Sequence, residues 1–343
     1  MALGLLPARL NFATGRVLDQ AKLVLLMLPS TGRALLRSTA VGVLLLGCRG
    51  APPSVLGRSH DRVLDAFGVR ELYAGAGRIW LSKWNGPARS FGSIVDPGDP
   101  EFDADHGEAS YEAAGGVLAV SGMVPRMYIH DPAHALAWRN VEVTTYAQRI
   151  DDSNIAWGGI MAYARTNHGT VGDEDRNICD DRGYGGMLTH RGAVKLEKEV
   201  NHCADERGGH GYAQALEKQR YAGGLPKGRW IGYKLVVRDQ DRGNKVRLEL
   251  WLDETDGAGG GAWEKVLELV DDGTAFGKND CDGHPCDPCA PGIDPALALT
   301  SSDDRPGSES HRPNATVYFR SDGVGPRGLL YKKMSVREIE PLP

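Results

Sequence analysis

The chain has 343 residues, of which 25% are charged and 41% hydrophobic, proportions typical of a soluble globular protein. The formal net charge of −5 includes no basic excess, which argues against nucleic acid as a partner. The 45 glycines and 19 prolines occur without any long helical pattern. This composition favours an all-β protein in which many turns join short strands.

A short apolar run ends at Cys48 and follows two arginines, Arg33 and Arg37. Positive charge, a short apolar segment and a small residue before a cysteine are the parts of a secretory signal. The sequence Leu-Leu-Gly-Cys that ends at Cys48 resembles the bacterial lipobox, whose cysteine is acylated and becomes the mature N-terminus. We expect a signal peptide over residues 1–47 and lipidation of Cys48. A cleaved signal without lipid and a buried strand are the alternatives.

The apolar run is too short to be a transmembrane helix. A second apolar stretch, Leu23–Leu28, precedes the arginines, so a signal of ordinary length begins at Met27, which we predict to be the true start. Residues 48–62 have the Pro, Gly and Ser content of a flexible tether, and residues 63–343 are predicted to form one domain. Arg49 follows the lipidated cysteine where aspartate would signal inner-membrane retention. This favours the outer membrane or the cell surface.

Five further cysteines are expected to meet oxidising conditions after export. Cys179 and Cys203 are predicted to form a disulfide across a loop. The segment CDGHPCDPC, residues 281–289, leaves three readings open: a disulfide within it, a zinc site, or a solvated loop that also offers calcium ligands. Its candidate residues are Cys281, Cys286 and Cys289 for a disulfide, the same thiolates with His284 for zinc, and Asp280, Asp282 and Asp287 for calcium.

Apolar and polar residues alternate in several segments, as strand side chains do. In residues 139–150, Val141, Val143 and Ala147 are predicted to face the core, and Glu142 and Tyr146 to face away. In residues 155–168, Ile160, Ala162 and Ala164 are predicted to face inward, and Tyr163, Arg165 and Asn167 outward. In residues 193–202, Lys195, Glu197 and Glu199 share a face, while Lys198 interrupts the apolar one. Further strands are expected at 229–240, 244–254, 315–323 and 328–339, and a short helix at 63–75.

So many strands with one apolar face each require two sheets packed face to face. We therefore predict an all-β, two-sheet antiparallel β-sandwich. The long insertions at 170–183, 203–226 and 271–313 are expected at its rims.

The strands WRNVEVTTYAQR, GGIMAYARTNH and KLEKEVNH, with the closing VYFRSDGVGPRGLLYKKMSVREIE, resemble the concanavalin A-like jelly-roll superfamily. This superfamily includes laminin-G-like domains, lectins, glucanases and polysaccharide lyases. The resemblance implies a jelly roll over roughly residues 80–340 with a glycan as partner. The chain lacks the ExDxE acid triad of the family-16 glucanases and the Gln-x-His strand of jelly-roll alginate lyases.

Two functions remain open: a non-catalytic glycan-binding or structural envelope protein, and a lyase that cleaves uronate-containing polysaccharides by β-elimination. Elimination needs a group that neutralises the sugar carboxylate, a base and an acid, roles suited to Arg, His and Tyr. The candidate catalytic residues are Arg165, His168, Tyr184 and His190. The candidate substrate-binding residues are Glu142, Tyr146, Tyr163, Asn167 and Lys195. No cofactor is expected, apart from the calcium alternative.

Overall fold

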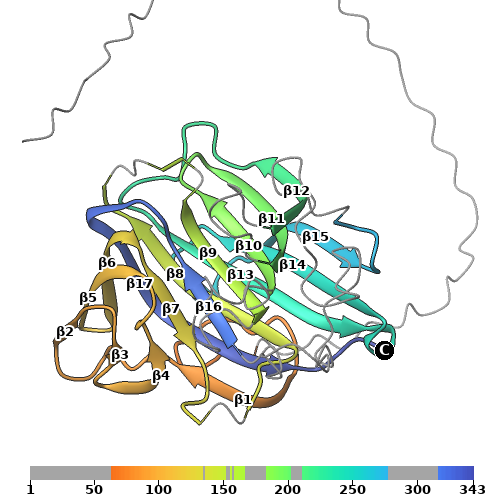
Figure 1. Ribbon diagram of the computed structural model, residues 1–343, viewed down its shortest axis with the longest axis horizontal. Helices are drawn as coiled ribbons and strands as arrows, with labels where there is room; N and C mark the ends of the chain where they lie inside the picture. Colours follow the sequence, from red (N-terminus) through yellow and green to blue (C-terminus); the bar gives the residue numbers. More distant parts are fainter. Residues whose placement is uncertain are drawn as a thin grey trace, which may run out of the picture. The chain divides into compact units, whose positions relative to one another are not determined.

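Two antiparallel sheets form the protein in a computed structural model that describes residues 63–133, 136–151, 155–156, 158–166, 183–201, 211–276 and 316–343 (Figure 1). The nine-stranded sheet has the order β15-β14-β13-β8-β17-β6-β5-β2, with β1 paired to β17. Its strands are β1 (Gly75–Leu81), β2 (Arg89–Phe91), β5 (Glu108–Ala114), β6 (Val117–Val124), β8 (Val141–Arg149), β13 (Trp230–Gln240), β14 (Lys245–Asp253), β15 (Glu264–Asp271) and β17 (Val324–Ile339).

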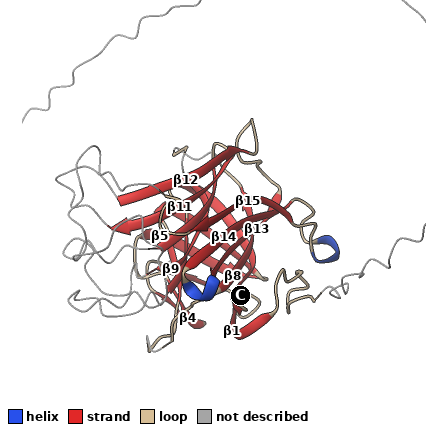
Figure 2. Cartoon of the chain, turned by 90° about the vertical axis from the view of Figure 1, so that its right-hand side faces the viewer, coloured by secondary structure: helices blue, strands red, loops and turns tan. Residues whose placement is uncertain are grey.

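The eight-stranded sheet has the order β12-β11-β10-β9-β16-β7-β4-β3. Its strands are β3 (Val95–Asp96), β4 (Asp99–Asp103), β7 (Arg126–Ile129), β9 (Gly159–Thr166), β10 (Gly183–Thr189), β11 (Ala193–Asn201), β12 (Gly211–Gln219) and β16 (Thr316–Arg320). The described residues otherwise contain two short 3-10 turns, Asp241–Gly243 and Ala258–Gly260 (Figure 2). The predicted all-β antiparallel sandwich is confirmed. No helix in the described ranges is long and apolar enough to cross a membrane.

The core lies between the two sheets and follows the predicted alternation. Val141, Val143 and Ala147 of β8 belong to it, as do Ile160, Ala162 and Ala164 of β9. Strands β8 and β9 are consecutive in the chain but belong to different sheets. Their outward residues therefore lie on opposite sides of the sandwich.

The helix expected at 63–75 is wrong, because residues 63–74 fold as an irregular turn. Leu64 and Arg70 form an isolated β-bridge around Gly68, whose φ of +72° is left-handed. The Asp65 carboxylate accepts the backbone N–H groups of Phe67 and Val69, both at 2.8 Å, and so stabilises the turn in place of a helix.

Four strand ends next to the expected insertions lie near one another at one end of the eight-stranded sheet, whereas residue 271, where the third insertion begins, ends β15 of the nine-stranded sheet. Cross-strand pairs at that end join Thr166 to Thr316, Gly183 to Glu199, and Asn201 to Gly211. The expected loop at 203–226 is corrected in part, since it contains strand β12. Several residues that were predicted to be lipidated, to form disulfides, to bind metal or to form the site lie outside the described residues. They are Cys48, Asn167, His168, Cys179, Cys203, Asp280, Cys281, Asp282, His284, Cys286, Asp287 and Cys289.

Candidate functional site

Three tyrosines form a row on the outer face of the eight-stranded sheet. Tyr128 of β7, Tyr318 of β16 and Tyr163 of β9 are cross-strand neighbours. The ring centroids of Tyr128 and Tyr318 are 5.2 Å apart, and those of Tyr318 and Tyr163 are 4.8 Å apart and nearly parallel at 6°. These rings belong to a cluster separate from the main core. The outer face thus carries a continuous aromatic surface across three strands.

A glycine lets this row continue to a carboxylate two strands away. Gly185 of β10 lies directly between Tyr163 and Glu197 in the strand register. A Cβ at Gly185 would lie 2.5 Å from Cε1 of Tyr163, so the ring occupies the space of a missing side chain. The Tyr163 hydroxyl donates a hydrogen bond to Glu197. Burial raises the pKa of Tyr163 well above its ordinary value, and Glu197 raises it further, so the phenol remains a proton donor.

A second row, parallel to the tyrosines, is charged at both ends. Its members in strand order are Arg126, Arg320, Met161, Met187 and Lys195. Both arginines bind Asp322: Nη1 of Arg126 lies 2.9 Å from Oδ1, and Nε of Arg320 lies 2.7 Å from Oδ2. Lys195 pairs with Glu197 at 3.1 Å. Burial of Asp322 opposes its ionisation, but the two guanidinium groups outweigh burial and lower its pKa.

Of the predicted binding residues, the structure brings Tyr163 and Lys195 together and places Glu142 and Tyr146 elsewhere. Glu142 and Tyr146 lie on β8, on the outer face of the nine-stranded sheet, where the Tyr146 hydroxyl donates to Asp253 at 2.8 Å. Glu142 and Tyr146 therefore do not share a face with Tyr163, and Asn167, another predicted binding residue, lies outside the described residues.

Arg165 is fully buried and does not lie on an outward polar face. Its φ of +53° is left-handed and interrupts the strand alternation that predicted its direction. Its Nη1 lies 2.8 Å from Oδ1 of Asp239 in the other sheet, and its Nε donates to the Arg139 carbonyl at 2.9 Å. This contact bridges the two sheets, so Arg165 is a structural residue of the fold and the predicted outward direction of its side chain is wrong.

Tyr184, another catalytic candidate, faces the core. Its hydroxyl donates to Oδ2 of Asp271 at 2.7 Å, and Asp271 also binds the ammonium group of Lys198 at 2.8 Å. Lys198, whose charge interrupted the apolar pattern, thus has its partner in the opposite sheet. Tyr184 therefore lies in the core and not on the outer face that carries the three tyrosines.

The catalytic candidate His190 is buried, and neither ring nitrogen has a hydrogen-bond partner within the part of the chain that the structure describes. Burial and the positive charge of Arg149 lower its pKa from 6.5 to about 4. A ring that stays neutral until about pH 4 suits a structural position better than proton transfer near neutral pH.

We predict that His190 makes the protein less stable as the pH falls from 6.5 to 4. The unfolded chain takes up this proton near pH 6.5 and the folded chain only near pH 4, so protonation favours unfolding by up to about 3 kcal/mol. Urea unfolding across this range, compared between wild type and His190→Gln, measures the effect. The variant should lose that part of the pH dependence, and parallel profiles would contradict the prediction.

The sequence interpretation missed Tyr128, Tyr318, Arg126 and Arg320. Each Tyr lies two residues from its Arg, in RMYI and in TVYFR, so alternation alone places both on one face. The alternation in these two segments therefore contained the information, but strands of only four and five residues are weak evidence that their side chains share a surface.

The two rows place aromatic rings beside carboxylate and guanidinium groups on one sheet face. Tyr318 and Tyr163 are stacked on each other, and all three tyrosine rings are buried. The charged groups offer hydrogen-bond donors and acceptors. No group of three or more His, Cys, Asp or Glu side chains among the described residues is placed to hold a metal ion.

No family model matches the sequence, and neither does any curated protein. The chain is similar to solved structures at low identity. Over 76% of this chain and 92% of the other, it shares 10% identity with the exoplasmic/lumenal domain of VIP36 in its calcium-bound form, with a TM-score of 0.38. A protein of unknown function with a galectin-like fold from Bacillus subtilis shares 13% identity over 78% and 98%, with a TM-score of 0.38. The carbohydrate recognition domain of Emp46p shares 8% over 73% and 96%, with a TM-score of 0.39. Likeness at this level does not identify a ligand.

Proposed function

We propose that the chain is a cell-envelope lipoprotein that binds a glycan on the outer face of the eight-stranded sheet. The observation that supports this most directly is the tyrosine row of Tyr128, Tyr318 and Tyr163 beside the charged row that ends in Lys195. The polar residues of this face, among them Lys195 and Glu197, are buried although they lie outside the main core, which is the placement expected of groups retained for recognition. Because the three rings are buried, ligand access requires a local opening of this face.

Binding should depend on Tyr318, the middle ring of the row. We expect Tyr318→Ala to weaken glycan retention about 5- to 150-fold, because a buried aromatic contact to a ligand contributes about 1–3 kcal/mol. Glu197→Gln should weaken it less, since the amide keeps one acceptor. A glycan array followed by titration of the retained glycan measures both.

Arg191→Ala is the control, because Arg191 pairs with Glu217 on the surface, where its side chain is 53% exposed. Retention unchanged in Tyr318→Ala, with the fold intact, would exclude this face as the site. Binding of no glycan by the wild type would favour a purely structural envelope protein.

The second candidate function is a lyase, favoured by Arg126 and Arg320 lying next to the tyrosine row. In β-elimination a base removes the C5 proton of a uronate, the electron pair forms the C4–C5 double bond, and the C4–O bond breaks with proton transfer to the leaving oxygen. An arginine would neutralise the sugar carboxylate and a tyrosine would transfer the proton. Incubation with uronate polysaccharides should then generate ultraviolet absorbance from the unsaturated product. Its absence across a broad panel rejects this function.

The lipid anchor makes a separate prediction. Cys48→Ser should abolish labelling by a fatty acid and release the protein from membranes, because only a cysteine thiolate accepts the lipid. Metabolic labelling and membrane fractionation measure the two effects. Unchanged membrane association of Cys48→Ser would refute the anchor, whatever the glycan experiments show.

A further inference from the structure

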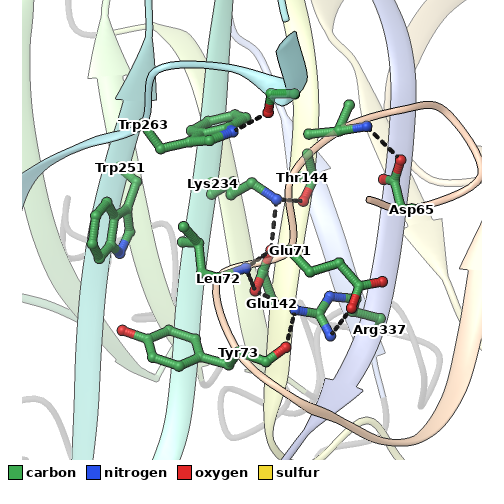
Figure 3. A network of polar contacts seen from close by, with 12 residues as sticks. Asp65, Glu71, Leu72, Tyr73, Glu142, Thr144, Lys234, Trp251, Trp263 and Arg337 are labelled. Atoms are coloured by element: carbon green, nitrogen blue, oxygen red, sulfur yellow. Dashed lines mark hydrogen bonds and ion pairs between the residues drawn. The ribbon is translucent and has the colours of Figure 1, made fainter. Parts of the chain in front are cut away.

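The outer face of the nine-stranded sheet is covered over β8 and open over β5 and β6. Residues 63–74 cross the covered part, where the Leu72 N–H donates to Oε2 of Glu142 at 3.1 Å. Glu142 also binds Lys234 at 2.6 Å and Arg337 at 2.7 Å, as Figure 3 shows. Its carboxylate is therefore already satisfied within the protein. On the open part, the outward side chains of β5 and β6 are exposed or half-buried.

An irregularity in β17 lies beside the open part of this face. In the pairing of β17 with β6, Val324 lies opposite Gly122 and Leu329 lies opposite Val120. Four residues of β17 thus lie opposite one residue of β6, and the extra residues leave the ladder as a bulge. Gly328, at the end of the bulge, has a left-handed φ of +55°, and a Cβ there would lie 1.6 Å from the Val120 carbonyl oxygen. This close approach of the two strands therefore requires glycine.

A cavity of about 300 Å³ lies where the bulge leaves the sheet. Its apolar side chains include Pro326 of the bulge, Leu330 and Ile150. The Ile150 N–H donates to the Gly328 carbonyl at 3.2 Å, which holds Ile150 beside the bulge. The outward side chains of β5 and β6 that line the cavity are small or polar: Ser110, Glu112, Ala119 and Ser121. The volume is at the lower limit for ligand sites and suits a ligand of about one sugar ring.

Glu112 supplies the one charge among the described side chains that line the cavity. Its side chain is exposed, and no hydrogen bond or ion pair joins it to another described residue. Lys332, a cation further along β17, binds Asp256 at 2.6 Å, and its Nζ lies 4.2 Å from the ring centroid of Trp230 in β13. Its charge is thus directed away from β5, which pairs on the other side of β17 through β6. A carboxylate without a protein cation favours a positively charged ligand.

We propose that this cavity binds a small hydroxylated amine of the size of an amino sugar. The ammonium group donates to Glu112, because hydrogen bonds between charged groups are stronger than neutral ones. The hydroxyl groups of the ligand bond those of Ser110 and Ser121, and the apolar face of its ring packs against Leu330 and Pro326. The site is independent of the tyrosine row, since the two lie on different sheets.

Titration of the full chain with glucosamine, at a pH where its amine is protonated, tests the site against glucose, which lacks the amine. The wild type should bind glucosamine about fivefold more tightly, as expected for an ion pair near solvent. Glu112→Gln should remove this preference, because the amide carries no charge. Glu108→Gln makes the same change at an exposed position of β5 outside the cavity and should keep it. Chemical shifts of the β5 and β6 amides measure binding.

Filling the cavity tests its position without changing any charge. Ala119→Leu should weaken binding of both sugars by about tenfold or more, because the larger side chain takes the space of the ligand. Ala114→Leu, at an exposed position of β5 outside the cavity, should change neither affinity. Equal affinity of the wild type for the two sugars, or a preference that survives in Glu112→Gln, would overturn the proposed amine. Unchanged binding in Ala119→Leu would exclude the cavity as the site.

Discussion

Lys198→Ala is expected to destabilise the protein by about 3–5 kcal/mol, because it leaves the buried carboxylate of Asp271 without its cation. Both side chains are fully buried, and their contact at 2.8 Å joins β11 in one sheet to β15 in the other. The Tyr184 hydroxyl and the Gly273 N–H continue to bind Asp271, but neither neutralises its charge. Urea unfolding at pH 7 measures the loss.

Two controls define the cause. Lys198→Met combined with Asp271→Asn should recover most of the stability, because a neutral amide still accepts from Tyr184 and Gly273 and no buried charge remains. Arg191→Ala, which breaks an ion pair whose side chains are 53% and 41% exposed, should cost less than about 1 kcal/mol. Equal losses in Lys198→Ala and Arg191→Ala would show that burial of the Lys198 pair has been overestimated.

Lys198 and Asp271 illustrate which parts of the fold the sequence could predict. Period-two alternation is local, so it correctly assigned Val141 and Ile160 to the core and Glu197 to the outside. It also marked Lys198 as an exception. Its partner Asp271 lies 73 residues further along the chain in the opposite sheet, and alternation contains no information about such pairing.

The same limit explains the errors in the candidate site. Glu142 and Tyr163 both face away from the core, but strand assignment to one sheet or the other depends on long-range pairing, which places them on opposite sides. Arg165 changes direction because of one left-handed residue within a strand, where glycine would be the usual signal. Lys195 lies in the same sheet as Tyr163 because β9, β10 and β11 are sequential neighbours, and its role in binding remains a prediction.

Substitution of Gly185 tests the proposed binding face most directly. Gly185→Ala should weaken glycan binding at least tenfold, because the new methyl group would lie 2.5 Å from the Tyr163 ring and must displace it from Glu197. Overpacking of this kind costs about 1–3 kcal/mol of stability, so the protein should still fold. Titration with the retained glycan measures affinity, and thermal unfolding measures stability.

Gly223→Ala is the matched control, since the described residues leave open space where its Cβ would be, and it should change neither quantity. The double variant Gly185→Ala, Tyr163→Ala removes the clash. It should regain part of the lost stability yet still bind glycan poorly, because the ring that contacts the ligand is gone. This combination separates a misplaced tyrosine from a damaged fold. Wild-type affinity in a folded Gly185→Ala protein would show that the position of Tyr163 does not matter for binding, and would move the glycan site away from the tyrosine row.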